Sequence, residues 1–313
     1  MNVFTSKKLL AILLPAAIGW LFCFAAFYLF REYGVVLFAI VPTGIGALSS
    51  FLISYNSDTE YWESFRTSIF SLLIFLAGIV VFAIEGIICA VMAFPFAAVA
   101  VLMGTWIGYI IANSKFLKRK PQIITILIII IPLLMSLESR LINNEDVFSV
   151  TTSVEINSSP EKVWKNVVIF PKLDEPTELL FRTGIAYPIN AEIDGNGVGA
   201  IRHCNFSTGS FVEPITVWNE PNLLKFSVTN QPDAMKEISP YDIHPDHLHG
   251  YFVSKEGQFK LTKLDNGHTL LEGTTWYTNR IKPDFYWTLW SDYIVHKIHT
   301  RVLEHIKKQC ENN

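Results

Sequence analysis

The chain has 313 residues, 50% of them hydrophobic and 17% charged, and a formal net charge of −3. Residues 1–142 contain 9 Lys/Arg and 6 Asp/Glu, a net charge of +3. Residues 143–313 contain 16 Lys/Arg and 22 Asp/Glu, a net charge of −6. Phosphate contacts dominate affinity for nucleic acid, so an acidic second half without a basic stripe argues against that partner. The four cysteines have no CxxC spacing and predict no disulfide framework. No cofactor is expected.

Long apolar stretches fill the first half. A helix needs about 20 apolar residues to cross a bilayer. Five stretches meet or approach this length: 9–30, 35–54, 67–90, 93–113 and 121–138. We expect a tight turn near Phe94-Pro95 between the third and the fourth. Residues 1–142 are therefore predicted to form an α-helical transmembrane bundle of about five spans, which makes the chain an integral plasma (inner) membrane protein.

The distribution of Lys and Arg predicts an orientation, because these residues gather on the cytoplasmic side. If the N-terminus lies in the cytoplasm, only Arg31 and Arg140 lie on the opposite side of the membrane. The other basic residues of this half then lie in the cytoplasm: Lys7, Lys8, Arg66, Lys115, Lys118, Arg119 and Lys120. An odd number of spans then makes the C-terminal domain extracytoplasmic. Glu85 is the only ionisable residue well inside a predicted span, and we interpret it as lying near a helix end.

Residues 143–313 are predicted to form a separate soluble α+β domain. Apolar residues alternate along 148–156, as in a strand with one buried face. A helix begins at Pro160, and a short one is expected near 176–181. A long last helix runs from Pro283 to about Lys308. Turn signals at 194–197, 207–210, 220–222 and 265–267 join consecutive strands into an antiparallel meander.

Two sequence runs carry a family resemblance: INSSPEKVW at 156–164 and GHTLLEGTTW at 267–276, the latter followed by the long helix. Together with the Gly-rich strands between them, they resemble the START/Bet v 1-like superfamily (SRPBCC), nearest to its polyketide cyclase/dehydrase and lipid transport family. The resemblance covers 147–308. It implies a helix-grip fold, in which a curved antiparallel sheet wraps around the last helix and encloses a hydrophobic cavity. A cavity does not by itself imply a reaction.

The last helix carries polar residues on its apolar face. Asp292, His296 and His299 have i, i+4, i+7 spacing, which predicts a hydrogen-bonded relay able to act as an acid/base pair or to hold a polar ligand group. Thr288 and Ser291 fall in the same arc and are further candidate ligand-binding residues. The alternative is a buried network whose hydrogen bonds are all satisfied internally.

Two more segments carry candidate residues. On the strand around 202–204, Arg202 and His203 point to opposite faces, and we expect one of the two faces to line the cavity. Cys204 would need a nearby base to act as a nucleophile. Three histidines lie within six residues and are weak candidates for a zinc site, although no HExxH or CxxC spacing supports a metal: His244, His247 and His249.

The sequence therefore predicts a membrane-anchored domain that binds a hydrophobic or amphipathic small molecule, such as a lipid or a polyketide-like compound, for sensing or transfer. The expected partners are that molecule and the bilayer. The alternative is an enzyme of cyclase, dehydratase or hydrolase type, which would use Asp292 with His296 or His299 in the same cavity.

Overall fold

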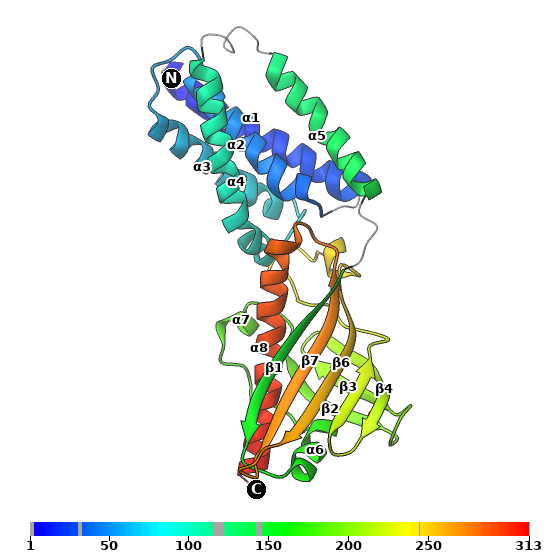
Figure 1. Cartoon of the computed structure of the whole chain (residues 1–313). Helices are drawn as coiled ribbons and strands as arrows, with labels where there is room; N and C mark the ends of the chain where they lie inside the picture. Colours follow the sequence, from blue (N-terminus) through cyan, green and yellow to red (C-terminus); the bar gives the residue numbers. More distant parts are fainter. Residues whose placement is uncertain (1–2, 31–32, 115–121, 142–145, 244, 313) are drawn as a thin grey trace. The chain divides into compact units, whose positions relative to one another are not determined.

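The computed structural model describes residues 3–30, 33–114, 122–141, 146–243 and 245–312. The chain divides into two compact units, a helical unit and a sheet unit (Figure 1). The predicted boundary at 142/143 falls within 142–145, which lies outside the described residues. Two segments of the second half of the sequence, Glu237–Asp246 and Ile281–Tyr286, belong to the helical unit. The sequence pattern did not indicate them.

The helical unit contains four helical stretches that are long and apolar enough to cross a membrane, counted over the described residues. The prediction of five spans is corrected to four. The fifth predicted stretch overlaps α5 (Gln122–Leu141), and the beginning of that stretch lies outside the described side chains, so α5 does not enter the count. The other elements are α1 (Val3–Phe24) with η1 (Ala25–Phe30), η2 (Val36–Ile40) with α2 (Val41–Ser54), α3 (Tyr61–Val81) and α4 (Ile87–Asn113).

The turn between α3 and α4 lies at 82–86, and the expected turn at Phe94-Pro95 is wrong. Ala83 adopts a positive φ of 55°, and the amide of Glu85 donates to the carbonyl of Ile79 at 3.2 Å, which ends α3. Pro95 lies inside α4. The turn residues before Glu85 are themselves apolar. The hydropathy of the sequence therefore stays high across the turn and does not reveal it. Glu85 therefore lies in a turn, at a helix end.

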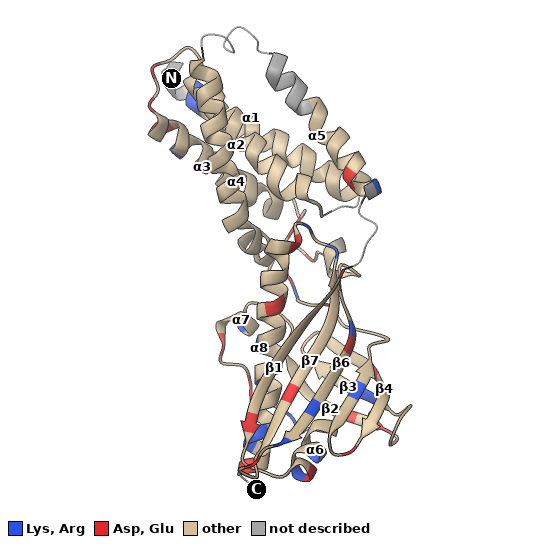
Figure 2. Cartoon of the chain, in the orientation of Figure 1, with Lys and Arg blue, Asp and Glu red and all other residues tan. Residues whose placement is uncertain are grey.

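Helices α2 and α4 pack with their backbones in close contact. A Cβ added to Gly104 would lie 1.9 Å from the carbonyl oxygen of Thr43, and one added to Gly108 would lie 2.1 Å from that of Ala47. Helices associate in lipid through such small-residue contacts, because apolar side chains gain little by leaving an apolar solvent. Lys and Arg, and Asp and Glu, are sparse along these helices (Figure 2).

The sheet unit is a seven-stranded antiparallel sheet in the order β1-β7-β6-β5-β4-β3-β2. Its strands are β1 (Val147–Ile156), β2 (Pro188–Asp194), β3 (Ile201–Phe206), β4 (Gly209–Asn219), β5 (Leu223–Ser227), β6 (Phe252–Lys263) and β7 (Thr269–Asn279). Two short helices, α6 (Pro160–Val168) and α7 (Leu179–Arg182), follow β1, and the long helix α8 (Asp284–Glu311) ends the chain. Strands β2 to β6 each pair with the next strand in the sequence, and β1 joins the sheet beside β7.

The core of the sheet unit lies between the sheet and α8. Val302, Leu303 and Ile306 of α8 are buried against Trp164 of α6 and Leu271 of β7. The sheet curves around α8 (Figure 1), which is the helix-grip architecture predicted from the sequence.

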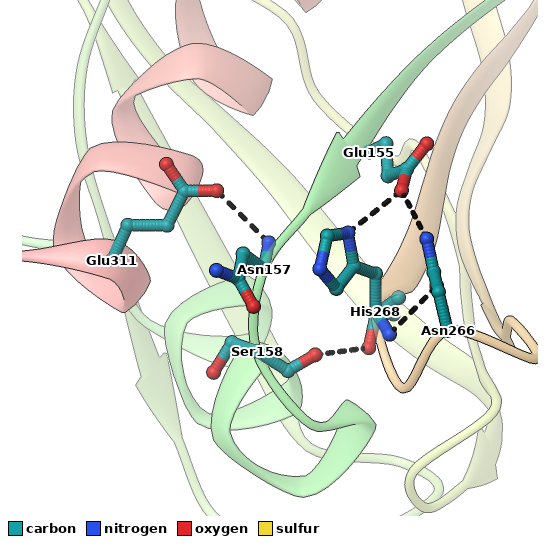
Figure 3. Close-up of polar contacts among 7 residues, drawn as sticks. Glu155, Asn157, Ser158, Asn266, His268 and Glu311 are labelled. Carbon is teal, nitrogen blue, oxygen red and sulfur yellow. Dashed lines mark hydrogen bonds and ion pairs between the residues drawn. The ribbon is translucent and has the colours of Figure 1, made fainter.

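The lower end of this unit is fastened by polar contacts (Figure 3). The amide of Asn157 donates to the carboxylate of Glu311 at 2.9 Å, which ties the end of α8 to the chain after β1. Thr269 Oγ1 donates to the carbonyl of Ser158 at 2.7 Å. The exposed carboxylate of Glu155 interacts with two side chains of the β6–β7 turn, those of Asn266 and His268. We interpret this network as structural, because it closes the end of the sheet on α8.

Candidate ligand-binding site

A cavity of about 120 Å³ lies within the sheet unit, lined by residues of β3 to β7 and of α8. Most of its wall is apolar. Six phenylalanines contribute to it: Phe170, Phe206, Phe211, Phe226, Phe252 and Phe259. Eight polar side chains join them: Arg202, Glu213, Ser254, Glu256, Gln258, Thr274, Thr275 and His299. An apolar pocket with a few convergent polar groups is the usual form of a small-molecule site.

Arg202 and Glu213 form a buried ion pair in this wall. They stand directly opposite each other on β3 and β4, and antiparallel pairing brings such residues within side-chain reach. Arg202 is 1% and Glu213 6% exposed. The guanidinium donates through Nη1 to the Glu213 carboxylate and through Nε to the carbonyl of Val168 at 3.2 Å. Two of its three nitrogens are thus held by protein groups.

The third nitrogen, Nη2, is buried and has no hydrogen-bond partner among the described residues. Three rings surround the guanidinium: its Cζ lies 5.5 Å from the ring centroids of Phe170 and Phe226 and 5.6 Å from that of Phe259. Such cation–π contacts stabilise the charge without using its N–H groups. The guanidinium therefore lies buried in an aromatic surrounding beside the cavity.

The ion pair keeps Arg202 charged. Burial has the largest single influence and lowers the pKa of the Arg202 guanidinium, but the charges of Glu213 and Cys204 and the hydrogen bonds to both side chains together outweigh burial and raise it. Burial raises the pKa of Glu213, and the attraction of Arg202 opposes that rise. Cys204, which follows on the same face of β3, has its thiol pKa raised to about 12 by burial and by Glu213. A thiol in that state is not a nucleophile near neutral pH.

His299 is the imidazole that lines the cavity. Its Nε2 hydrogen-bonds Thr275 Oγ1 at 2.8 Å, and its Nδ1 lies 3.3 Å from Thr152 Oγ1. Burial, with a smaller contribution from the charge of His296, lowers the pKa of His299 to about 4. His299 is partly buried and is one of the residues that line the cavity. At pH 7, His299 is therefore neutral and hydrogen-bonded to two threonine hydroxyls.

The predicted relay of Asp292, His296 and His299 has a different arrangement. Asp292 is exposed and accepts a hydrogen bond from Tyr277 Oη at 2.5 Å. His296 is also exposed, and its Nδ1 bonds Thr152 Oγ1 at 2.8 Å. Among the described residues, no hydrogen bond joins Asp292 to either histidine. Thr152 links the two imidazoles instead, and it was not among the residues predicted from the sequence.

The remaining candidates of the last helix lie away from the cavity. Val295 is the first α8 residue in its wall, and Thr288 and Ser291 precede it by one to two turns. Ser291 Oγ accepts a hydrogen bond from Asn279 Nδ2 at 3.1 Å. Helical periodicity in the sequence predicts which residues share a face of α8. It does not predict where along the helix the cavity ends.

The strand alternation around 202–204 holds, and it places Arg202 and Cys204 in the wall of the cavity. His203 takes the opposite face and does not line it. The register of the β3–β4 hairpin could have indicated the ion pair: a turn at 207–208 pairs 206 with 209 and therefore 202 with 213.

The histidines of the histidine-rich segment have different surroundings, and a metal at any of them stays a prediction. His244 lies outside the described residues. His247 is buried, whereas His249 is exposed and lies 3.2 Å from a carboxylate oxygen of Asp233. His247 and His249 share no group of potential metal ligands.

The helical unit has a polar cluster of its own at the end of the α3–α4 turn. Tyr33 Oη donates to Glu85 at 2.7 Å. The carboxylate of Glu237 accepts from the amides of Ile88 at 3.1 Å and Cys89 at 3.3 Å, and so caps the N-terminus of α4. Carboxylates are stabilised at that position by the helix dipole and the unpaired amides.

No family model and no curated protein matches the sequence. Several solved structures are similar to it. A truncated norcoclaurine synthase from Thalictrum flavum is 13% identical over 54% of this chain and 97% of that chain, with a TM-score of 0.36. The Zhui aromatase/cyclase from Streptomyces sp. R1128 is 12% identical over 53% and 95%, with a TM-score of 0.35. Ara h 8.0201 is 14% identical over 54% and 100%, with a TM-score of 0.32. We base the functional argument on the site itself.

Proposed function

We propose that the sheet unit binds a hydrophobic or amphipathic small molecule in its cavity, and that the apolar helices hold this binding unit at a membrane. One observation carries the proposal: the sheet unit holds a cavity of about 120 Å³ whose wall is mostly apolar, with six phenylalanines and several polar side chains. Such a pocket buries the apolar body of a ligand and orients it through its polar groups.

Binding is favoured over the acid/base enzyme by the state of His299. Both of its ring nitrogens face threonine hydroxyls, and Asp292 is engaged with Tyr277 instead of orienting an imidazole. A general base needs a free nitrogen within reach of the substrate proton and a pKa near the working pH. His299, with a pKa of about 4, serves better as a fixed polar part of the wall.

We further propose that the binding unit lies on the side of the membrane opposite Lys7. Lys7 Nζ donates to the carbonyl of Tyr55 at 2.7 Å, so the N-terminus and the α2–α3 turn share one end of the helical unit. Tyr33, Glu85 and Glu237 mark the other end. Lys7 in the cytoplasm makes the binding unit extracytoplasmic if the chain crosses the membrane an odd number of times, which requires one crossing beyond the four counted over the described residues.

The sidedness is tested by labelling intact cells with a membrane-impermeant maleimide. Tyr241 and Asp58 are exposed residues of the two ends. We expect Tyr241→Cys to be labelled in intact cells and Asp58→Cys only after permeabilisation. The reverse pattern would overturn the proposed side while leaving the binding proposal untouched.

The binding proposal is tested by native mass spectrometry of the full chain in lipid nanodiscs. We expect a small molecule to co-purify, and its occupancy to fall in Gly273→Ala. A methyl group there would meet Leu303 and Phe259 at 3.6–3.7 Å, which is ordinary contact, while taking volume from the cavity. His203→Ala, on the other face of β3, is the control. Occupancy that is equal in both variants and wild type would contradict a ligand in this cavity.

A further inference from the structure

One exposed face of α8 changes from apolar to polar along the helix. Residues four apart in a helix share a face, and Phe285, Leu289 and Tyr293 follow this spacing. Their side chains are 68%, 66% and 47% exposed. The same face then becomes polar: Asp292, His296, Thr300 and Glu304. The exposed apolar strip, residues 285, 289 and 293, is therefore confined to the first turns of α8, over about 12 Å at the helical rise per residue.

The first turn of α8 packs against a helix that is long and apolar enough to cross a membrane. Residues 281–286 belong to the helical unit, as does α4. Tyr286 Oη donates to the carbonyl of Met92 in α4. The ring of Phe96 lies 5.0 Å from that of Tyr286 and 5.8 Å from that of Phe285. The apolar strip therefore begins beside a candidate membrane span.

The place of these contacts along α4 indicates their depth in a bilayer. The N-terminus of α4 is capped by the carboxylate of Glu237, a charged group that is strongly disfavoured in hydrocarbon. Met92 lies about 8 Å and Phe96 about 14 Å from that end along the helix axis. With 27 residues, α4 is about 40 Å long, whereas a hydrocarbon core is about 30 Å thick. If the capped end extends beyond the core by the difference, Met92 and Phe96 lie where α4 enters the hydrocarbon.

Polar groups bound the apolar strip at both ends. Lys282 and Asp284, at the start of α8, form an ion pair at 2.7 Å. At the other end the strip closes with Tyr293, beside the exposed Asp292. Charged side chains avoid the hydrocarbon core, and tyrosine is enriched at the membrane–water interface. Both ends therefore fit the headgroup level of a bilayer.

The size of the strip favours lipid over a protein partner. Stable protein–protein interfaces bury about 800 Å² and 20–30 residues on each side. Three side chains along two turns of a helix provide far less. An exposed apolar patch with a polar rim marks a protein or a membrane contact, and this one is continuous with a candidate span.

From this continuity we propose that residues 285–293 of α8 lie in the bilayer interface, where lipid acyl chains cover Phe285, Leu289 and Tyr293. Helix α8 then has two roles, because it contacts lipid at its beginning and lines the cavity from Val295 onward. The two roles are independent of each other, so an empty cavity would leave the lipid contact in place.

The test is electron paramagnetic resonance of a nitroxide label on introduced cysteines, with the full chain in phosphatidylcholine nanodiscs. Oxygen concentrates among acyl chains and a nickel chelate stays in water, so the collision rates with the two reagents distinguish lipid from water. We expect oxygen collisions to exceed nickel collisions in Leu289→Cys. Glu304→Cys, exposed on the polar part of the same face, is the matched control and should show the reverse. The labelled wild-type chain provides the background of the native cysteines: Cys23, Cys89, Cys204 and Cys310.

Two further labels give the direction of the strip. The oxygen excess should be larger in Phe285→Cys than in Tyr293→Cys, because the strip runs from α4 towards the polar part of the face. Nickel collisions at 289 as frequent as at 304 would overturn the proposal, since the strip would then face water. Low collision rates with both reagents at 289 would also overturn it, because protein would then cover the strip. The replaced side chains are largely exposed, so the core of the sheet unit stays intact in every variant.

Discussion

The helical unit and the sheet unit treat their buried polar groups differently. In the helical unit, carboxylates serve the fold: Glu85 accepts from Tyr33, and Glu237 caps α4. In the sheet unit, the buried Glu213 carboxylate is instead paired with a charge, because Arg202 donates to it. A carboxylate held by neutral donors keeps its charge unbalanced, whereas the ion pair is neutral as a whole. Four predictions test this contrast.

The largest effect is expected in the helical unit, from Gly104→Leu. Its Cβ would lie 1.9 Å from the backbone oxygen of Thr43, so α2 and α4 would have to separate. Overpacking costs about 1–3 kcal/mol where side chains can move, and backbone atoms move less easily. We expect loss of monodisperse protein in size-exclusion chromatography. Gly44→Ala is the matched control, because its Cβ would meet only Ile131 at 3.7 Å. Equal behaviour of the two variants would contradict close α2–α4 packing.

The next effect concerns the ion pair. Arg202→Met leaves the Glu213 carboxylate buried without its partner, which costs about 3–5 kcal/mol, whereas replacing both residues by Met and Leu is near neutral. Chemical denaturation of the full chain should show a large loss for the single variant and recovery in the double variant. Lys260→Met breaks an exposed pair with Glu272 and serves as control, with a change of about 1 kcal/mol or less. A small loss of stability in Arg202→Met would mean that water reaches the ion pair.

The third effect is a pH dependence of stability from His299. Its folded pKa of about 4 lies below the ordinary value of 6.5, so the unfolded state takes up the proton first as pH falls. This contribution is complete above pH 6.5 and is lost between pH 6.5 and 4, on the order of 3 kcal/mol at most. His299→Gln should flatten this part of the stability curve. His296→Gln, at an exposed position bonded to the same threonine, should leave it in place.

The sequence predicted an antiparallel meander and a long last helix because strand alternation, turn residues and an amphipathic pattern are local signals, and the family resemblance added the helix-grip arrangement of these elements. It also placed Arg202 and Cys204 on one strand face and named His299, which lines the cavity. It did not foresee that Glu213 faces Arg202, which depends on hairpin register, or that Thr152 contacts both histidines from a strand 144 and 147 residues away. The α3–α4 turn was misplaced because apolar residues occupy it. Side-chain pairing across elements has no periodic signature in one sequence.

The smallest effect is expected from Glu237→Gln, which keeps the shape of the α4 cap and removes its charge. A carboxylate at a helix N-terminus contributes about 0.3–1 kcal/mol, so the melting temperature should fall only slightly. Gly86→Ala perturbs the same cap more, because its Cβ would lie 2.0 Å from Glu237 Oε2 and displace the carboxylate. We expect neither change to alter the occupancy of the cavity in native mass spectrometry, because the Glu237 carboxylate accepts its hydrogen bonds from amides of α4. A changed occupancy in Glu237→Gln would contradict a role limited to capping this helix.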